Sequence, residues 1–323
     1  MADYKGIKGF KVQSLASDPT LVEGQIWYNT TGNALKYQAS LGAWAAGDAF
    51  NTARGTPGGA GTSTACLIFG GFAPGVSVLT EVYNGSSWTE SADMNTGRSQ
   101  VVGFGTTTAG IAGPGGQNAG APGRLANVEA WDGTSFTEVN DVGNAKYVCG
   151  SSGTQTAGLV FQGGYGTTYP GWNESYDGTS WTEEADCNTG RGDGGCGGTQ
   201  TAAFFAGGGL DPSLLTEIWN GTSWTEVADL NTQKQGLAGT GGTTTAALCT
   251  GGTEPPVNSV LTETWDGTSW AEVADLATAR SGGANHVGTA VLGMAAGGES
   301  PAGKINLVED WSYANVVKTV TVS

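Results

Sequence analysis

The sequence predicts an all-β fold: a six-bladed β-propeller preceded by a short N-terminal extension that contains a β-hairpin. Three observations lead to this prediction. A motif recurs along the 323 residues with a period suited to four short strands per blade. Glycine contributes 57 residues and charged residues only 13%, and long runs of helix formers are missing, as is typical of short strands joined by tight turns. Finally, 11 Trp, 9 Tyr and 9 Phe supply enough surface to bury, which argues against disorder.

The recurring motif reads Asn or Asp, Gly, Ser or Thr, Ser, an aromatic residue, and Glu two positions later. Its aromatic residues are Trp88, Phe136, Trp181, Trp224 and Trp270, and Trp44 begins the series in a degenerate form. Successive members lie 44, 48, 45, 43 and 46 residues apart. Because Asn-Gly and Asp-Gly are the strongest short hairpin signals, the motif predicts a hairpin between the third and fourth strands of each blade.

Other positions are fixed relative to this aromatic residue. A second aromatic lies five positions before it and an Asp five positions after it, in most repeats. Glu lies seven positions before it, with a counterpart in the final repeat: Glu81, Glu129, Glu174, Glu217, Glu263 and Glu309. A basic residue lies ten positions after it in every repeat: Arg54, Arg98, Lys146, Arg191, Lys234 and Arg280. A glycine pair follows the aromatic by about 26 or 27 positions.

The basic column is interpreted as a structural ring in which each cation pairs with an acidic residue of the Glu or Asp columns, retained for register rather than stability. Six cations around a channel could also form an anion or sugar-acid site, as in sialidases. Strict repetition argues against that alternative, because a catalytic site needs different groups from different blades.

Each blade is expected to contain four strands in chain order. A small-residue inner strand follows the basic residue, for example at residues 99–104, because blades crowd towards the axis. An apolar second strand, for example 157–162, ends at the double glycine, and a variable loop follows. The third and fourth strands, for example 216–219 and 224–227, flank the Asn/Asp-Gly turn. The aromatics fill the wider spaces between blades, and radial repetition leaves only short, protected strand edges.

The apolar strand, the Gly-Gly pair, the aromatic before Asn/Asp-Gly and the Trp about five residues later resemble the kelch repeat. The resemblance covers residues 44–323 and implies a kelch-type propeller, but it implies little about function, because propellers host binding modules and enzymes alike. Residues 316–322 alternate like a fourth strand of the last repeat. On that interpretation, the hairpin that ends at Trp44 is an extra edge piece.

Residues 1–43 break the repeat and form a separate predicted domain. Residues 24–37 predict a β-hairpin with aromatics at both ends, which resembles short hairpins near the attachment end of bacteriophage tail-fibre and appendage proteins. Residues 1–40 carry a net charge of +1, which leaves −17 for the rest of the chain. The resemblance and the charge suggest an attachment segment, with candidate residues Lys5, Lys8, Lys11, Trp27 and Tyr37. An ordinary flexible terminus is the alternative.

Charge and composition exclude several functions. A net charge of −16 without a basic run argues against a nucleic-acid partner. No apolar stretch suits a signal peptide or a membrane span, so no membrane partner is expected. The five cysteines lack metal-type spacing, and a bridge between Cys187 and Cys196 remains an open alternative. His286 is the single histidine, and no cofactor or metal is expected. The adhesion tripeptide spelled by Arg191-Gly-Asp193 is attributed to chance, because the repeat already requires Arg191.

One face of the propeller is the predicted binding site. The turns between strands one and two, and between three and four, are short and uniform, whereas the loops after the double glycine vary. Variable loops on a rigid scaffold are typical of recognition. The candidate residues on this loop face are Phe72, Arg124, Tyr165, Tyr169, Trp172 and Lys304. The aromatics could stack on a sugar ring or anchor a protein contact, or they could pack back onto their own loops.

The leading hypothesis is a non-enzymatic virion appendage or decoration protein. It would dock on other virion structural proteins through its N-terminal segment, with or without forming homo-oligomers, and display the propeller to a host-surface glycan or protein. The alternative is an intracellular, cytoplasmic kelch module for protein–protein interaction. A glycan-acting, sialidase-like enzyme is the third hypothesis.

Overall fold

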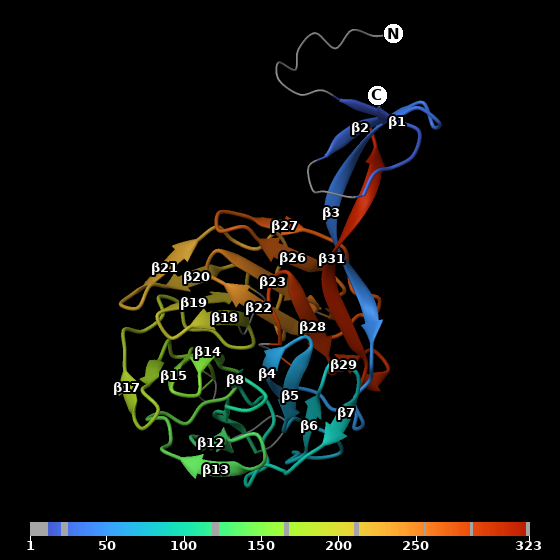
Figure 1. Cartoon of the computed structure of the whole chain (residues 1–323). Helices are drawn as coiled ribbons and strands as arrows, with labels where there is room; N and C mark the ends of the chain where they lie inside the picture. Colours follow the sequence, from blue (N-terminus) through green and yellow to red (C-terminus); the bar gives the residue numbers. More distant parts are fainter. Residues whose placement is uncertain are drawn as a thin grey trace. The chain divides into compact units, whose positions relative to one another are not determined.

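The computed structural model describes residues 12–20, 25–117, 123–164, 168–209, 213–254, 256–284 and 287–320 (Figure 1). The chain divides into two compact units, Trp44–Ser312 and a smaller unit made of Met1–Ala43 and Tyr313–Ser323. The larger unit is a six-bladed β-propeller. It differs from the expected 44–323 domain at its end, because the C-terminal residues belong with the N-terminal segment.

Five blades are antiparallel four-stranded sheets in simple chain order within the described residues. The first consists of β4 (Gly58–Thr62), β5 (Ala65–Phe69), β6 (Thr80–Tyr83) and β7 (Trp88–Glu90). The second consists of β8 (Gly103–Gly105), β9 (Gly110–Ala112), β12 (Val128–Trp131) and β13 (Phe136–Val139). The third consists of β14 (Gly150–Thr154), β15 (Ala157–Phe161), β16 (Asn173–Tyr176) and β17 (Trp181–Glu183). The fourth consists of β18 (Gly195–Thr199), β19 (Ala202–Ala206), β20 (Thr216–Trp219) and β21 (Trp224–Val227). The fifth consists of β22 (Gly239–Thr243), β23 (Ala246–Thr250), β26 (Thr262–Trp265) and β27 (Trp270–Glu272).

The Asn/Asp-Gly turn forms the outer hairpin of each of these blades. In the third blade, the Asp177 carboxylate accepts hydrogen bonds from the backbone amides of Thr179 (2.8 Å) and Ser180 (2.7 Å). Gly178 has φ of 92°, a conformation that glycine adopts without strain. The turn brings Tyr176 opposite Trp181, with ring centroids 4.8 Å apart. The same five-residue spacing therefore pairs the two aromatic columns of the sequence.

The sixth blade closes the ring with residues from both ends of the propeller sequence. β28 (Leu292–Ala296) pairs with β31 (Val308–Thr319), and β3 (Ala34–Gly47) is the next strand in the same sheet. The indole rings of Trp44 and Trp311 lie 5.3 Å apart. Trp44 Nε1 donates to Thr262 Oγ1 of the fifth blade (3.0 Å), just as Trp270 Nε1 donates to Thr216 Oγ1 of the fourth (3.1 Å). Trp44 thus occupies the position of a fourth-strand tryptophan.

This closure corrects one expectation from the sequence. Residues 316–319 continue β31 and do not form a fourth strand of the last repeat. The residues around Trp44 provide that strand instead, so they are an integral part of the sixth blade and not an extra edge piece. The apolar pattern was correct for a strand, but it does not specify which neighbour the strand pairs with.

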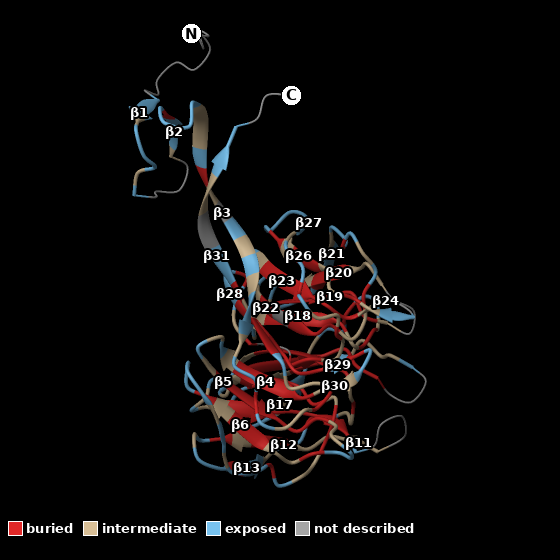
Figure 2. Ribbon diagram, turned by 90° about the vertical axis from the view of Figure 1, so that its right-hand side faces the viewer, coloured by how far each residue is buried: buried red, intermediate tan, exposed pale blue. Residues whose placement is uncertain are grey.

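The core lies between neighbouring blades. Phe50, Cys66 and Ile68 pack with Met294 and Ala296 across the junction of the first and sixth blades. Figure 2 shows buried residues concentrated in the strands of the propeller. Near the axis only small residues fit: a Cβ on Gly103 would lie 2.5 Å from the Gly59 carbonyl oxygen of the adjacent blade. This steric limit explains the glycine-rich inner strands.

Short hairpins form parts of the variable loops between second and third strands. They are β10 (Gly115–Gly116) with β11 (Arg124–Leu125), β24 (Thr253–Glu254) with β25 (Val257–Asn258), and β29 (Glu299–Ser300) with β30 (Gly303–Lys304). These ladders give parts of the loop face a defined backbone.

The smaller unit contains β1 (Gln13–Leu15), β2 (Ile26–Asn29), the first part of β3 and the end of β31. β2 and β3 form the predicted hairpin, with Ile26 opposite Tyr37. The Asp18 carboxylate accepts hydrogen bonds from Trp27 Nε1 (3.1 Å) and Asn29 Nδ2 (2.8 Å). The pKa of Asp18 is lowered, chiefly by the Asn29 hydrogen bond. The structure holds no membrane-spanning helix within the residues it describes.

Candidate functional site

The six basic residues of the repeat are buried, and each lies against the Glu on the third strand of the blade that follows it, which is the Glu of the next motif in the sequence. The nitrogen–oxygen distances are 2.9 Å for Arg54–Glu81, 2.8 Å for Arg98–Glu129, 3.0 Å for Lys146–Glu174, 2.9 Å for Arg191–Glu217, 3.3 Å for Lys234–Glu263 and 2.6 Å for Arg280–Glu309. Burial lowers the pKa of Arg54, Arg98 and Arg280, and the glutamates act in the opposite direction. The column therefore does not present an open ring of positive charge to an anion.

The fourth blade shows what such a pair holds together. Arg191 donates to the carbonyl oxygens of Gly207 (2.8 Å) and Leu215 (2.6 Å) as well as to Glu217. Glu217 Oε2 accepts from the backbone amide of Asn188 (2.8 Å). The pair thus connects the segment that enters a blade to the third strand of that blade. Because the Arg191 guanidinium is buried, the Arg191-Gly-Asp193 tripeptide is not displayed for an adhesion receptor.

The cysteines are core residues. Cys187 and Cys196 are not joined by a disulfide, and both side chains are buried. Burial raises the pKa of Cys149 and of Cys196 to about 12. Thiols with such pKa values are poor nucleophiles near neutral pH.

Two of the predicted loop-face residues come together at the junction of the first and sixth blades. Lys304 Nζ lies 4.6 Å from the ring centroid of Phe72. Lys304 is also the cross-strand neighbour of Glu299 in the β29–β30 hairpin. Around them lies an open pocket of about 390 Å³, which we call the junction pocket, lined by Thr56, Phe72, Ser99, Gln100, Glu299 and Lys304.

The other predicted loop residues lie elsewhere. Arg124 is half-buried in β11 of the second blade, and Trp172 is half-buried ahead of β16 in the third. The Tyr169 ring lies against the segment that leads into the fourth blade, since a Cβ on Gly192 would lie 2.5 Å from Tyr169 Cε1 and 2.7 Å from Val148 Cγ2. Burial raises the pKa of Tyr169 to about 12, with Asp193 as a further cause. Tyr165 and His286 lie outside the described residues.

The predicted attachment residues include some that lie outside the described residues, one that is exposed and one that is buried. Lys5, Lys8 and Lys11 lie outside the described residues. Tyr37 is 38% exposed, but Trp27 is fully buried. The choice of Trp27 as a docking residue was therefore wrong, because its indole belongs to the core of the smaller unit, where Asp18 holds it.

A set of six residues that the sequence analysis missed surrounds the propeller axis. Each stands two positions after a basic residue, and all have positive φ: Thr56 (49°), Gln100 (51°), Val148 (51°), Asp193 (58°), Gly236 (57°) and Gly282 (58°). We call them the axial ring. Backbone amides donate to carbonyl oxygens of the preceding blade, for example Gly236 to Asp193 (2.6 Å) and Gly282 to Gly236 (2.7 Å). Thr56 of the first blade donates in the same way to Gly282 of the sixth (2.6 Å).

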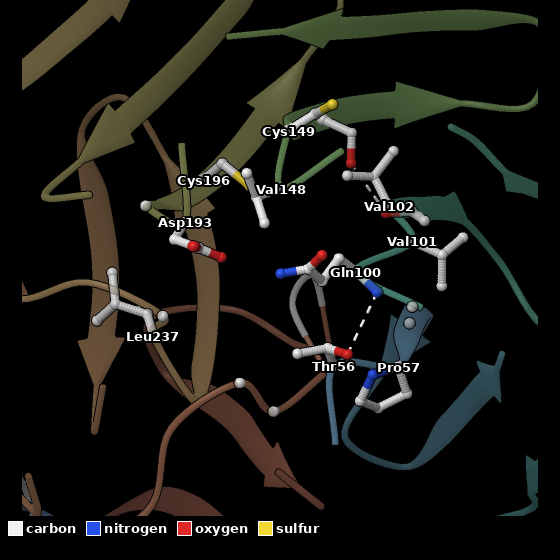
Figure 3. A pocket seen from close by; sticks show the side chains of 18 residues that line it. Thr56, Pro57, Gln100, Val101, Val102, Val148, Cys149, Asp193, Cys196 and Leu237 are labelled. Atoms are coloured by element: carbon white, nitrogen blue, oxygen red, sulfur yellow. Dashed lines mark hydrogen bonds between the residues drawn. The ribbon is translucent and has the colours of Figure 1, made fainter. Parts of the chain in front are cut away.

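The axial ring lines a small cavity of about 40 Å³, the axial cavity. Figure 3 shows the side chains of Asp193 and Gln100 pointing towards one another across it, with Val148 between them. Thr56 and Gln100 line both the axial cavity and the junction pocket, so the two share a wall. Within the described residues, no cluster of three or more His, Cys, Asp or Glu side chains could hold a metal ion.

No model of a known protein family matches the chain, and no curated protein matches it. Among solved structures, that of YjhT matches with a TM-score of 0.66 and 12% sequence identity, over 83% of this chain and 99% of that chain. An identity this low shows a shared architecture and nothing about function. The comparison therefore supports the β-propeller fold alone.

Proposed function

We propose that this chain is a non-enzymatic virion appendage or decoration protein whose propeller binds a host-surface glycan. The observation that carries the proposal is the junction pocket, where an aromatic ring, a cation, a carboxylate, an amide and two hydroxyl residues converge. Its volume of about 390 Å³ lies within the range of small-molecule sites, roughly 300–1,000 Å³.

The chemistry of the junction pocket suits a sugar. The apolar face of a pyranose ring packs on an aromatic side chain such as Phe72. Sugar hydroxyls act as both donors and acceptors, and the Gln100 amide, the Glu299 carboxylate and the Lys304 ammonium can serve them. The loop face supplies these groups from different blades, so the pocket breaks the symmetry of the repeat.

A non-enzymatic role is supported by how the repeated charges are used. The six basic residues and their glutamates are engaged in buried ion pairs, which removes the symmetric columns as candidate acids and bases. The virion part of the proposal rests on the resemblance of the 24–37 hairpin to phage appendage hairpins and on the +1 charge of residues 1–40. An intracellular protein-interaction module is the alternative function.

Glycan binding is tested with the full chain on a glycan array, followed by calorimetric titration of the sugars that bind. Phe72→Ala is expected to weaken binding at least tenfold, because it removes the stacking surface. Val257→Ala, at a 60% exposed residue of another loop-face hairpin, is the matched control and should bind normally. Absence of any sugar binding, or equal affinities of the two variants, would contradict the proposal.

The virion role is tested by mass spectrometry of purified phage particles. A deletion of residues 1–43 would remove most of β3, the neighbour of β31 in its sheet, so a substitution is preferable. The full chain should be found on particles, and a variant with Lys5, Lys8 and Lys11 changed to Glu should be depleted from them. If neither protein is found on particles, the intracellular interaction module becomes the better account.

A further inference from the structure

Four of the six axial-ring positions carry a side chain, although their backbone conformation would suit glycine. All six positions adopt left-handed backbone conformations, which glycine tolerates best, and glycine does occupy two of them, Gly236 and Gly282. Thr56 and Val148 are β-branched, and such residues are rarely found with positive φ. Strained backbone that persists at a cavity indicates that the side chains have a role there.

The ring is also unequal around the axis. Thr56, Gln100 and Asp193 place polar groups at the axial cavity, whereas Gly236 and Gly282 leave their side open. Glycine is not needed at Gly236 for lack of space, because the nearest atom to an added Cβ would be Ser281 Cβ at 3.8 Å. A ligand site requires different groups on different sides, whereas a purely structural ring has no need of such asymmetry.

Asp193 supplies the distinctive group. Within the described residues, nothing donates a hydrogen bond to its carboxylate, and Figure 3 shows it directed into the cavity opposite Gln100. Arg191, two residues earlier, points to Glu217 and does not neutralise it. Asp193 is half-buried, and a carboxylate partly shielded from water and without a partner favours an incoming cation or a strong donor.

We propose that the axial cavity is a subsite for a protonated primary amine, with Asp193 as its counter-charge and Gln100 as a further hydrogen-bond partner. An ammonium group is close to the size of a water molecule, and a cavity of about 40 Å³ can hold a group of that size. The inference deepens the proposed function and rests on it for the route of entry. A sugar in the junction pocket would reach the cavity past Thr56 and Gln100, so the glycan is one that carries a free amino sugar.

The electrostatic surroundings agree with a cationic ligand. Burial raises the pKa of Asp193 to about 6, so the carboxylate is charged at neutral pH but its charge is poorly stabilised. The titratable groups that interact with it are Tyr169 and Cys149, and Asp193 raises the pKa of both. Both are neutral at pH 7, so neither competes with the ligand for the carboxylate.

The test compares glucosamine with N-acetylglucosamine by calorimetric titration of the full chain at pH 7.5. Glucosamine, which has a protonated amine for much of its population, should bind at least tenfold more tightly than the acetylated sugar. Asp193→Asn should abolish that preference while leaving N-acetylglucosamine affinity unchanged. Asn also tolerates left-handed backbone, so the ring is preserved. Asp141→Asn removes an exposed carboxylate with the same change in net charge and is the matched control.

A second measurement separates this inference from the proposed function. Methylammonium chloride, titrated at constant ionic strength, should shift the NMR amide signals of Asp193 and Gln100, and the shifts should weaken as pH falls below about 6. If both sugars bind equally and Asp193→Asn has no effect, the inference is overturned and glycan binding stands. If neither sugar binds but methylammonium produces the shifts, the glycan proposal fails and the amine subsite stands. Absence of both responses overturns the subsite.

Discussion

Replacing Glu217 by alanine tests whether the buried pairs hold the blades together. Glu217 accepts hydrogen bonds from Arg191 (2.9 Å) and from the amides of Asn188 (2.8 Å) and Thr189 (3.3 Å). Its loss leaves a buried guanidinium without its counter-charge, which costs about 3–5 kcal/mol of the free energy of unfolding. That is a large share of the roughly 5–15 kcal/mol that stabilises a typical protein.

The same hydrogen bonds predict the order of stability among variants of Arg191 and Glu217. Arg191→Met should cost less than Glu217→Ala, because the Glu217 carboxylate keeps its two backbone donors. Adding Arg191→Met to Glu217→Ala removes the uncompensated charge, so the double variant should recover about 1–3 kcal/mol relative to Glu217→Ala alone. Glu226, the exposed cross-strand neighbour of Glu217, provides the control, and Glu226→Ala should change stability by less than about 0.5 kcal/mol.

The assay is equilibrium unfolding in urea, followed by circular dichroism and by tryptophan fluorescence. Coincident transitions are needed before free energies are compared. A loss below about 1 kcal/mol for Glu217→Ala, or a double variant less stable than Glu217→Ala, would refute the assigned role of the pair.

Three further predictions follow from other parts of the structure. Trp44→Ala should lower the free energy of unfolding by about 2–4 kcal/mol, because it removes a half-buried indole that contacts Trp311 and Thr262. Urea unfolding measures this loss, with Tyr37→Ala, at an exposed site, as the control variant. Equal unfolding midpoints for the two variants would argue against closure of the ring through Trp44. The folded-state pKa of Asp193, about 6, lies above its ordinary value of 3.8, so its stabilising contribution is fully present below pH 3.8 and is lost as pH rises through about 6. The stability of the native protein relative to Asp193→Asn should thus fall by roughly 1–3 kcal/mol between pH 4 and pH 7.5, and a pH-independent difference would show that the carboxyl is not desolvated. The cysteine thiols should resist iodoacetamide at pH 8 in the folded protein and react in urea, as mass spectrometry can measure; rapid labelling of Cys149 or Cys196 in the native state would contradict their burial.

The strands of the blades could be predicted because each local signal agrees with its neighbours. The third and fourth strands at 216–219 and 224–227 coincide with β20 and β21, since alternating residues flank an Asn/Asp-Gly turn that fixes the register. The Glu column was visible for the same reason, because its spacing from the turn never changes. The Asp column provides none of the ion pairs observed for the basic residues.

The axial ring could not be predicted, because Thr, Gln and Val at three of its positions disfavour left-handed backbone and give no sign of it. Hydrogen bonds between neighbouring blades, such as that from the Gln100 amide to the Thr56 carbonyl oxygen (3.0 Å), accompany that conformation and exist only in the closed ring. The junction pocket was found in part: Phe72 and Lys304 were chosen from variable loops, but their meeting depends on how the first and sixth blades adjoin. Trp27 was misjudged because an aromatic in a short hairpin can face a partner or its own core, and Asp18 decides the outcome.

The junction of β3 with β31 has a consequence for how the protein folds. Trp44 and Trp311 are separated by most of the chain, so the last blade depends on a contact of very high sequence separation. Such contacts form late and slowly, because the entropy of loop closure opposes them until the rest of the ring is in place. During synthesis, the strand around Trp44 leaves the ribosome long before its partner exists. Until then its unpaired backbone is an exposed edge, and the nascent chain should be most prone to misassociation in that interval.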